Sequence, residues 1–307
     1  MKKFMLSVAT LCVVVTSCTL DKTDYESEIS TVVTEYIEYE EVVSITEDNY
    51  LISINALNGT FYKGYNAIRL NITNTETNES LNTSEVTFLP IMTNYNGNHT
   101  SGPHQYNLEY NIEDDYYEGY TVFTSESNDS EYWKLYITFS DNGETYSVTQ
   151  NITIEEQTNM NLNMTAFTAS DGEQYFIALV APQQPKIAEN ELVAGIYTYN
   201  SPTSDAGTFP DPSQFSYSEV EDYTLLLDPR MPEPSMGNHS SPNNQDLIQG
   251  EDGLYYGVVN YTMTGNWTLN FRLQNTFGAV IKGTEVSTDF TPGIEGERSE
   301  LYIDILF

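Results

Sequence analysis

The sequence has 307 residues, of which 45 are acidic and 11 basic, and its formal net charge is −34 at pH 7. Such a chain repels polyanions, and affinity for phosphate backbones comes from Lys and Arg contacts, so nucleic acid binding is excluded. The sequence has no zinc-protease motif, phosphate-binding loop or dinucleotide fingerprint. We therefore expect a protein that is not an enzyme and has no catalytic residues.

The N-terminus has the order of a bacterial lipoprotein signal. A basic start at residues 1–4 precedes an apolar run over 5–15, too short to span a bilayer core of about 30 Å as a helix. Val15-Thr16-Ser17-Cys18 then resembles the lipobox at which such signals are cut. We expect removal of residues 1–17 and acyl chains such as palmitate on Cys18, which would anchor the protein to a membrane. The alternative is an ordinary secretory signal in which Cys18 has no role.

The predicted cleavage leaves a body without thiols, because Cys12 lies in the leader and Cys18 would be acylated. Loss of Lys2 and Lys3 with the leader would change the net charge from −34 to −36. Residues 18–40 are polar and acidic without an apolar period, which predicts a flexible tether. Acidic residues after a lipidated cysteine also resemble the export signals of Bacteroidetes surface lipoproteins. An outer-membrane or cell-surface location is expected, with the periplasmic face as the alternative.

The rest of the chain has the composition of a β-protein. It contains 24 Tyr and 13 Phe, abundant Thr, Val and Ile, and few of the residues that build helices. Apolar and polar side chains alternate at 50–54, 67–72, 133–139 and 267–273, with Asn, Gly and Asp between these runs. Period-two alternation predicts strands with one buried face, so we expect an all-β fold of tandem immunoglobulin-like β-sandwiches with few helices.

An internal repeat divides this body into two copies. The aligned segments are 48–56 with 172–181, Pro90-Ile91-Met92 with Pro229-Arg230-Met231, Gly97-Asn98-His99 with Gly237-Asn238-His239, and 117–120 with 255–258. The second copy is one residue longer between its Met and its His. The only two tryptophans of the chain, Trp133 and Trp267, fall at matching positions. We predict two β-sandwich domains, repeat 1 at 41–157 and repeat 2 at 158–307.

The order of these motifs resembles a known family. Pro-x-Met, Gly-Asn-His, x-x-Gly-x-Tyr and Trp-x-Leu-x-Phe, in this sequence, are similar to the YtkA-like domain, an immunoglobulin-like sandwich related to FixH and found in exported or membrane-anchored proteins. Residues 231–271 carry the fuller match. The first copy departs from the pattern by an insertion between Tyr120 and Trp133 and by a different loop at 93–96. The resemblance implies a role in delivering copper to respiratory oxidases.

Histidines and methionines are concentrated in the two matching loops, which hold all three histidines of the chain. Thioether sulfur is a soft ligand suited to Cu(I), and neutral imidazole serves either copper state. These ligand types agree with what the resemblance implies, so we predict a copper site in each copy and no other cofactor. The expected ligands are Met231, Met236 and His239 in the second copy, with Met263 as a candidate fourth, and Met92, His99 and His104 in the first.

Two alternatives stay open at this point. Met92 and Met231 follow strand ends and could fill the top of a sandwich, while Gly-Asn-His could be a turn in which the histidine has no role. The whole chain could instead be a non-catalytic interaction module that recognises a glycan or an envelope protein through aromatic faces. The side chains considered for such faces are Tyr106, Tyr110, Tyr116, Tyr117 and Tyr120.

Overall fold

Alternating side chains produce the strands of this protein. The four alternating runs lie within β2 (Tyr50–Leu57), β4 (Gly64–Asn74), β10 (Glu131–Asp141) and β21 (Asn266–Gln274). In β2, β4 and β10 the buried side chains alternate with partly exposed ones, whereas in β21 Thr268 and Asn270 on the opposite face are buried as well. The helical structure of the described residues is a single 3-10 turn, η1 (Pro212–Gln214), so the predicted all-β sandwich class is confirmed.

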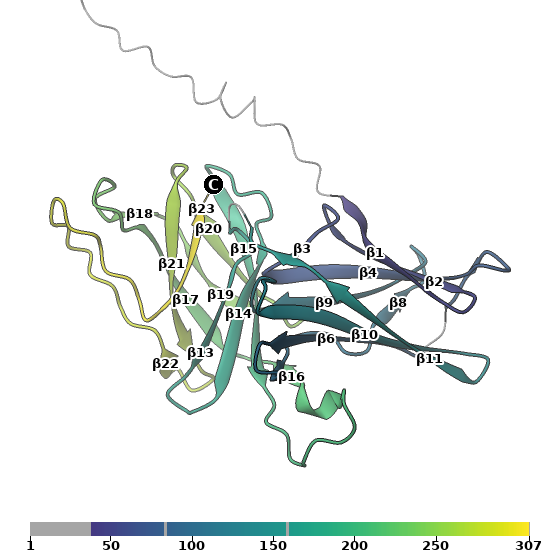
Figure 1. Ribbon diagram of the computed structural model, residues 1–307. Coiled ribbons are helices and arrows are strands. Elements are labelled where there is room, and N and C mark those ends of the chain that lie inside the picture. The colour runs from purple at the N-terminus through teal and green to yellow at the C-terminus, as the bar shows by residue number, and fades with distance from the viewer. Residues whose placement is uncertain (1–37, 83–84, 158–159, 307) are drawn as a thin grey trace, which may run out of the picture. The chain divides into compact units, whose positions relative to one another are not determined.

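The computed structural model describes residues 38–306 except 83–84 and 158–159 (Figure 1). The predicted signal peptide at 1–17, Cys18 and most of the predicted tether lie outside the described residues. The first strand, β1 (Tyr39–Glu47), begins within the last two residues assigned to the tether at 18–40.

The first copy forms two antiparallel sheets and a short parallel pair. Its other strands are β3 (Phe61–Tyr62), β5 (Glu79–Ser80), β6 (Val86–Asn94), β7 (His99–Thr100), β8 (Glu109–Asn111), β9 (Tyr116–Phe123), β11 (Glu144–Ile152) and β12 (Ile154–Glu155). One sheet has the order β1-β2-β4-β9-β8 with β5 on β4, the other has the order β11-β10-β6-β7, and β12 pairs with β3. With β2 as strand A, these orders are the ABED and CFG sheets of the immunoglobulin fold.

The second copy repeats this strand order. Its other strands are β13 (Met164–Thr168), β14 (Gln174–Ala181), β15 (Glu189–Tyr199), β16 (Tyr217–Glu219), β17 (Thr224–Met231), β18 (His239–Ser240), β19 (Gln245–Gln249), β20 (Tyr255–Asn260), β22 (Val280–Lys282) and β23 (Leu301–Leu306). The order β13-β14-β15-β20-β19 matches the first sheet, and β23-β21-β17-β18 matches the second. Pairing of β19 with β17 joins the two into one eleven-stranded sheet. The domain limits at 157 and 158 stay a prediction, since residues 38–307 form one compact unit.

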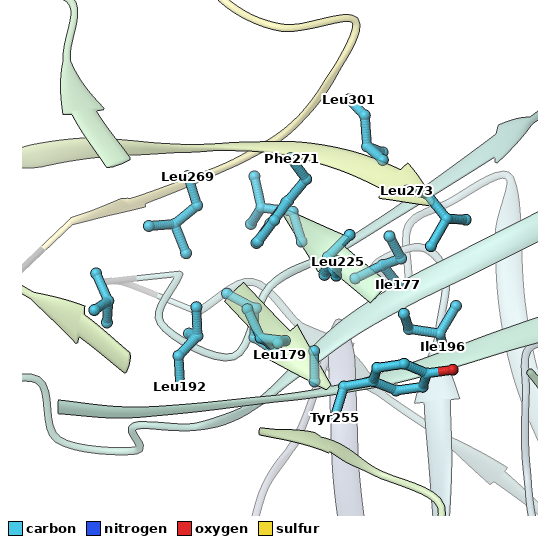
Figure 2. Packing of buried hydrophobic residues seen from close by; sticks show 14 of the residues in the cluster. Ile177, Leu179, Leu192, Ile196, Leu225, Tyr255, Leu269, Phe271, Leu273 and Leu301 are labelled. Atoms are coloured by element: carbon cyan, nitrogen blue, oxygen red, sulfur yellow. The ribbon is translucent and has the colours of Figure 1, made fainter. Parts of the chain in front are cut away.

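Each copy has its own apolar core around a buried tryptophan. Trp133 on β10 and Trp267 on β21 are both fully buried, and each indole N–H donates to a backbone carbonyl, of Ser125 and Met263 respectively. Figure 2 shows the second core, where side chains from β14, β15, β17, β20 and β21 meet between the layers. The matching positions of the two tryptophans are therefore explained by packing.

We expect Trp133→Ala and Trp267→Ala each to lower the free energy of unfolding by about 3–5 kcal/mol, because each leaves a large cavity and an unpaired carbonyl. Urea unfolding followed by far-UV circular dichroism measures this. Tyr132→Ala is the matched control, since the side chain of Tyr132 is 49% exposed on the outer face of β10. A cost for Tyr132→Ala as large as that for Trp133→Ala would contradict this account of the core.

Candidate metal site

Met231 and His239 lie directly opposite each other at one end of the second sandwich. They are paired in the antiparallel β17–β18 ladder, and directly opposite residues project from the same face of a sheet. Met231 is 1% exposed and belongs to the second core. The ring of half-buried His239 lies 6.0 Å from that of Trp267, in an edge-on arrangement. Both side chains therefore face the interior at this end of the sandwich.

The loop between β20 and β21 completes this end. Nε2 of His239 lies 2.8 Å from Oγ1 of Thr262. Half-buried Met263 packs against the same core as Met231, and so does Met236. Gly265 has a φ of +131°, and a Cβ built on it would lie 2.7 Å from the terminal methyl of Met231. Met231, Met236, His239 and Met263 are here named the Met/His cluster. The three methionines contact the second core, and His239 pairs with Met231.

A tight turn and the C-terminal segment hold the loop that carries Met236. Gly237 and Asn238 both have positive φ, as in the turn considered from the sequence. The buried amide of Asn238 donates to the carbonyls of Ser287 at 3.0 Å and Asp289 at 3.5 Å. Its Oδ1 atom is buried without a hydrogen-bond partner among the described residues, and the same is true of Oε2 of Glu233. The loop is therefore tied to a segment far along the chain.

The donors of the Met/His cluster suit a soft ion. Among the residues that the structure describes, no three His, Cys, Asp or Glu side chains gather closely enough to hold a metal, so a site here depends on methionine sulfur. Thioethers and imidazole favour Cu(I) over harder ions. If Nε2 of His239 donates its hydrogen to Thr262, Nδ1 keeps its lone pair for a ligand, which is a common arrangement around metal-binding histidines. The residues present fit copper.

The first copy does not bring its predicted ligands together. His99 is paired with Thr93, and its Nδ1 lies 3.0 Å from the Thr93 hydroxyl, on the outer face of β6. Met92, one residue earlier, projects from the opposite face and packs against the first core. The ring of His99 instead contacts Phe209 at 4.3 Å between centroids. In both copies the methionine pairs with the residue eight positions later, Thr100 in the first and His239 in the second. His99 comes one position earlier, and neighbouring residues of a strand project from opposite faces.

His104, the third predicted ligand of the first copy, is buried elsewhere. It is 9% exposed, its Nδ1 lies 2.8 Å from the carbonyl oxygen of Gly102, and its ring meets that of Tyr217 edge-on. Burial lowers the pKa of His104 from 6.5 to about 4, and the bond to Gly102 opposes this shift only in part. The ring is therefore neutral at pH 7 and part of the packing between strands.

The burial of His104 predicts a loss of stability in mild acid. Between pH 6.5 and about 4 only the unfolded chain protonates this ring. The free energy of unfolding therefore decreases as the pH is lowered through this range, by about 3 kcal/mol in all. Above pH 6.5 both states are neutral and the effect is absent. His104→Gln should make the fall between pH 7 and pH 4.5 shallower in urea unfolding. An identical fall in both proteins would show that His104 does not cause it.

The aromatic faces considered for an interaction module are largely covered. Tyr117 is in the first core, Tyr116 is buried beside Arg69, and Tyr110 packs against the same core. Tyr106 lies against Leu89 and Ile91. Tyr120 stacks on Tyr197 of the second copy, with centroids 5.4 Å apart. None of these five side chains forms an open aromatic surface.

Comparisons with known proteins do not assign this chain to a family. No protein-family profile matches the chain, and no curated protein matches it. Among solved structures, a conserved domain protein from Bacillus anthracis aligns with 88% of this chain and 90% of that one, at 12% identity and a TM-score of 0.28. A likeness at that TM-score supports no conclusion about fold or function. Within the described residues, no helix has the length and apolar character needed to cross a membrane.

Proposed function

We propose that this chain is a lipid-anchored protein of the bacterial cell envelope, with YtkA-like sandwiches, whose second sandwich binds Cu(I) at the Met/His cluster. The observation that carries the proposal is the pairing of Met231 with His239 on one face of the sheet. Bound copper would add a redox-active, soft Lewis acid outside the cytoplasm. The surrounding residues would hold the ion without thiols and keep water away from the buried sulfur of Met231.

Three features support the choice of copper over packing alone. Met236 and Met263 are only half-buried, so their sulfur atoms are not fully enclosed by the core. The Thr262 hydroxyl orients the ring of His239 through Nε2. Trp267 closes the inner side with an aromatic ring. Together these features leave sulfur and nitrogen donors of the Met/His cluster open to an ion.

Cu(I) binding is tested on a full-length Cys12→Ser, Cys18→Ser chain, because the two thiols would bind the ion themselves. Anaerobic competition with a colorimetric Cu(I) chelator should give one ion per chain. Met236→Ala with His239→Ala should weaken binding by about 100-fold or more, since loss of a second-shell partner alone typically costs 10–100-fold. Quenching of Trp267 fluorescence in a Trp133→Phe background should follow the same titration.

Met92→Ala with His99→Ala is the matched control, because the first copy places these side chains on opposite faces of β6. It should leave Cu(I) affinity unchanged. Equal Cu(I) affinity of the Cys12→Ser, Cys18→Ser chain with and without the Met236→Ala and His239→Ala substitutions would overturn the proposal.

The lipid anchor has its own test. In a bacterium that processes lipoproteins, labelled palmitate should be incorporated into the wild-type protein and not into Cys18→Ser, and the wild type should sediment with membranes. Cys12→Ser is the control, because Cys12 would be removed with residues 1–17 and its loss should change neither result. Palmitate incorporation into Cys18→Ser would contradict the predicted anchor.

A further inference from the structure

A polar cavity lies on the outer face of β17 and β21 in the second copy, on the side of the sheet away from the core. Its volume is 240 Å³, just below the range of about 300–1,000 Å³ typical of sites for drug-sized ligands. The segment 284–288 forms one wall. Two of the four arginines of this acidic chain, Arg230 and Arg272, line it. Asp228, Asp246 and Glu285 also line it, so the cavity has charged groups of both signs.

The guanidinium of Arg230 is fixed by an ion pair that involves only one of its three nitrogens. Its side chain is 8% exposed, and its Nε donates to Oδ2 of Asp228 at 3.0 Å. Among the described residues no hydrogen bond involves its two terminal nitrogens. A buried guanidinium normally pairs all of its donors, and its planar fork matches a carboxylate. The two terminal nitrogens of Arg230 therefore remain available to a group in the cavity.

The first copy shows that the fold does not require this polarity. At the positions of Asp228, Arg230 and Asn270 it has Leu89, Ile91 and Tyr136, in the same register on the matching strands. There the outer face is apolar and is covered by Phe215. The repeated architecture therefore tolerates a closed apolar face at this place, and the polar cavity is a property of the second copy alone.

A carboxylate of the protein already occupies part of the cavity. Oε1 of Glu285, on the wall segment, accepts from Nη1 of Arg272 at 2.7 Å. The Glu285 side chain is 80% exposed, so this bond can exchange with solvent or with a ligand at little cost. The pair shows which chemical group Arg272 can hold from the cavity side.

From these observations we infer that the cavity binds a small hydroxylated carboxylic acid, such as a sugar acid. The ligand carboxylate would take the place of Glu285 on Arg272 and reach the free nitrogens of Arg230. Hydroxyl groups would donate to Asp246, of which one oxygen already accepts from the backbone N–H of Leu227. Asp228 and Asp246 would repel a second acid group, so a monocarboxylate fits best. This site is separate from the Met/His cluster.

The high negative charge of the chain does not prevent such binding. Charges farther than a Debye length of about 8 Å at physiological ionic strength are largely screened, so the groups that line the cavity set the local field. A ligand that displaces Glu285 from Arg272 would meet two guanidinium groups, of Arg230 and Arg272, and two carboxylates, of Asp228 and Asp246. The net negative charge of the chain should instead affect the salt dependence of ligand affinity. Lower ionic strength should weaken binding, because it exposes the ligand to repulsion from the remaining acidic surface.

Binding is tested by calorimetric titration of the full chain with glucuronate, glucose and inorganic phosphate. We expect binding of glucuronate and none of glucose, which has similar hydroxyls without the acid. Arg272→Thr copies Thr138 of the first copy and should weaken glucuronate binding at least about tenfold, as loss of a charge-assisted bond does. Arg230→Lys should weaken it too, because lysine lacks the planar fork.

Glu285→Ala distinguishes binding from a purely structural role for these arginines. Removal of the internal carboxylate should make glucuronate bind about two- to fivefold more tightly, while a structural role predicts no gain. Arg298→Ala, outside the cavity, is the control and should leave affinity unchanged. Equal binding of glucose, tighter binding of phosphate, or no glucuronate binding in either wild type or Glu285→Ala would overturn the inference.

Discussion

Side-chain alternation along β6 and β17 decides which residues of this protein can meet. In both copies a methionine near the strand end points into the core and its neighbour points out. The position of the histidine in the next strand then determines the face of the sheet from which its side chain projects. His239 comes eight positions after Met231 and pairs with it, whereas His99 comes seven positions after Met92 and pairs with Thr93. Two loops that share Gly-Asn-His therefore have different chemistry, because neighbouring residues of a strand project from opposite faces of the sheet.

The fold could be predicted because its signal is local. Alternation over 133–139 and 267–273 identifies β10 and β21 directly, and the burial of Trp133 and Trp267 agrees with their role as core residues. Strand order could not be predicted from this local signal, since it depends on pairings between residues far apart in the chain. The sequence repeat nevertheless corresponds to a repeat in that order. The differences are the β3–β12 pair of the first copy and the pairings of β17 with β19 and of β21 with β22 in the second.

The sites were harder to predict, for reasons that differ between them. The ligand set of the first copy failed to assemble because residue types near each other in sequence need not share a face, as Met92 and His99 show. The one-residue difference in spacing between Met and His was visible in the sequence and would have indicated this outcome. The arginine cavity joins residues from β17, β21 and the 284–288 wall, so no local motif marks it. Its one trace in the sequence is Arg230 aligned with Ile91.

The segment 284–296 limits the insertions and deletions that this protein can accept during evolution. Ser287 and Asp289 accept from Asn238 in the loop of the Met/His cluster, and the N–H of Gly296 donates to the carbonyl of Pro232. The same stretch of chain forms the wall of the arginine cavity. An insertion or deletion within it would therefore disturb both places at once. Relatives that lengthen or shorten this stretch should lose both sets of residues together, whereas changes elsewhere on the surface can accumulate independently.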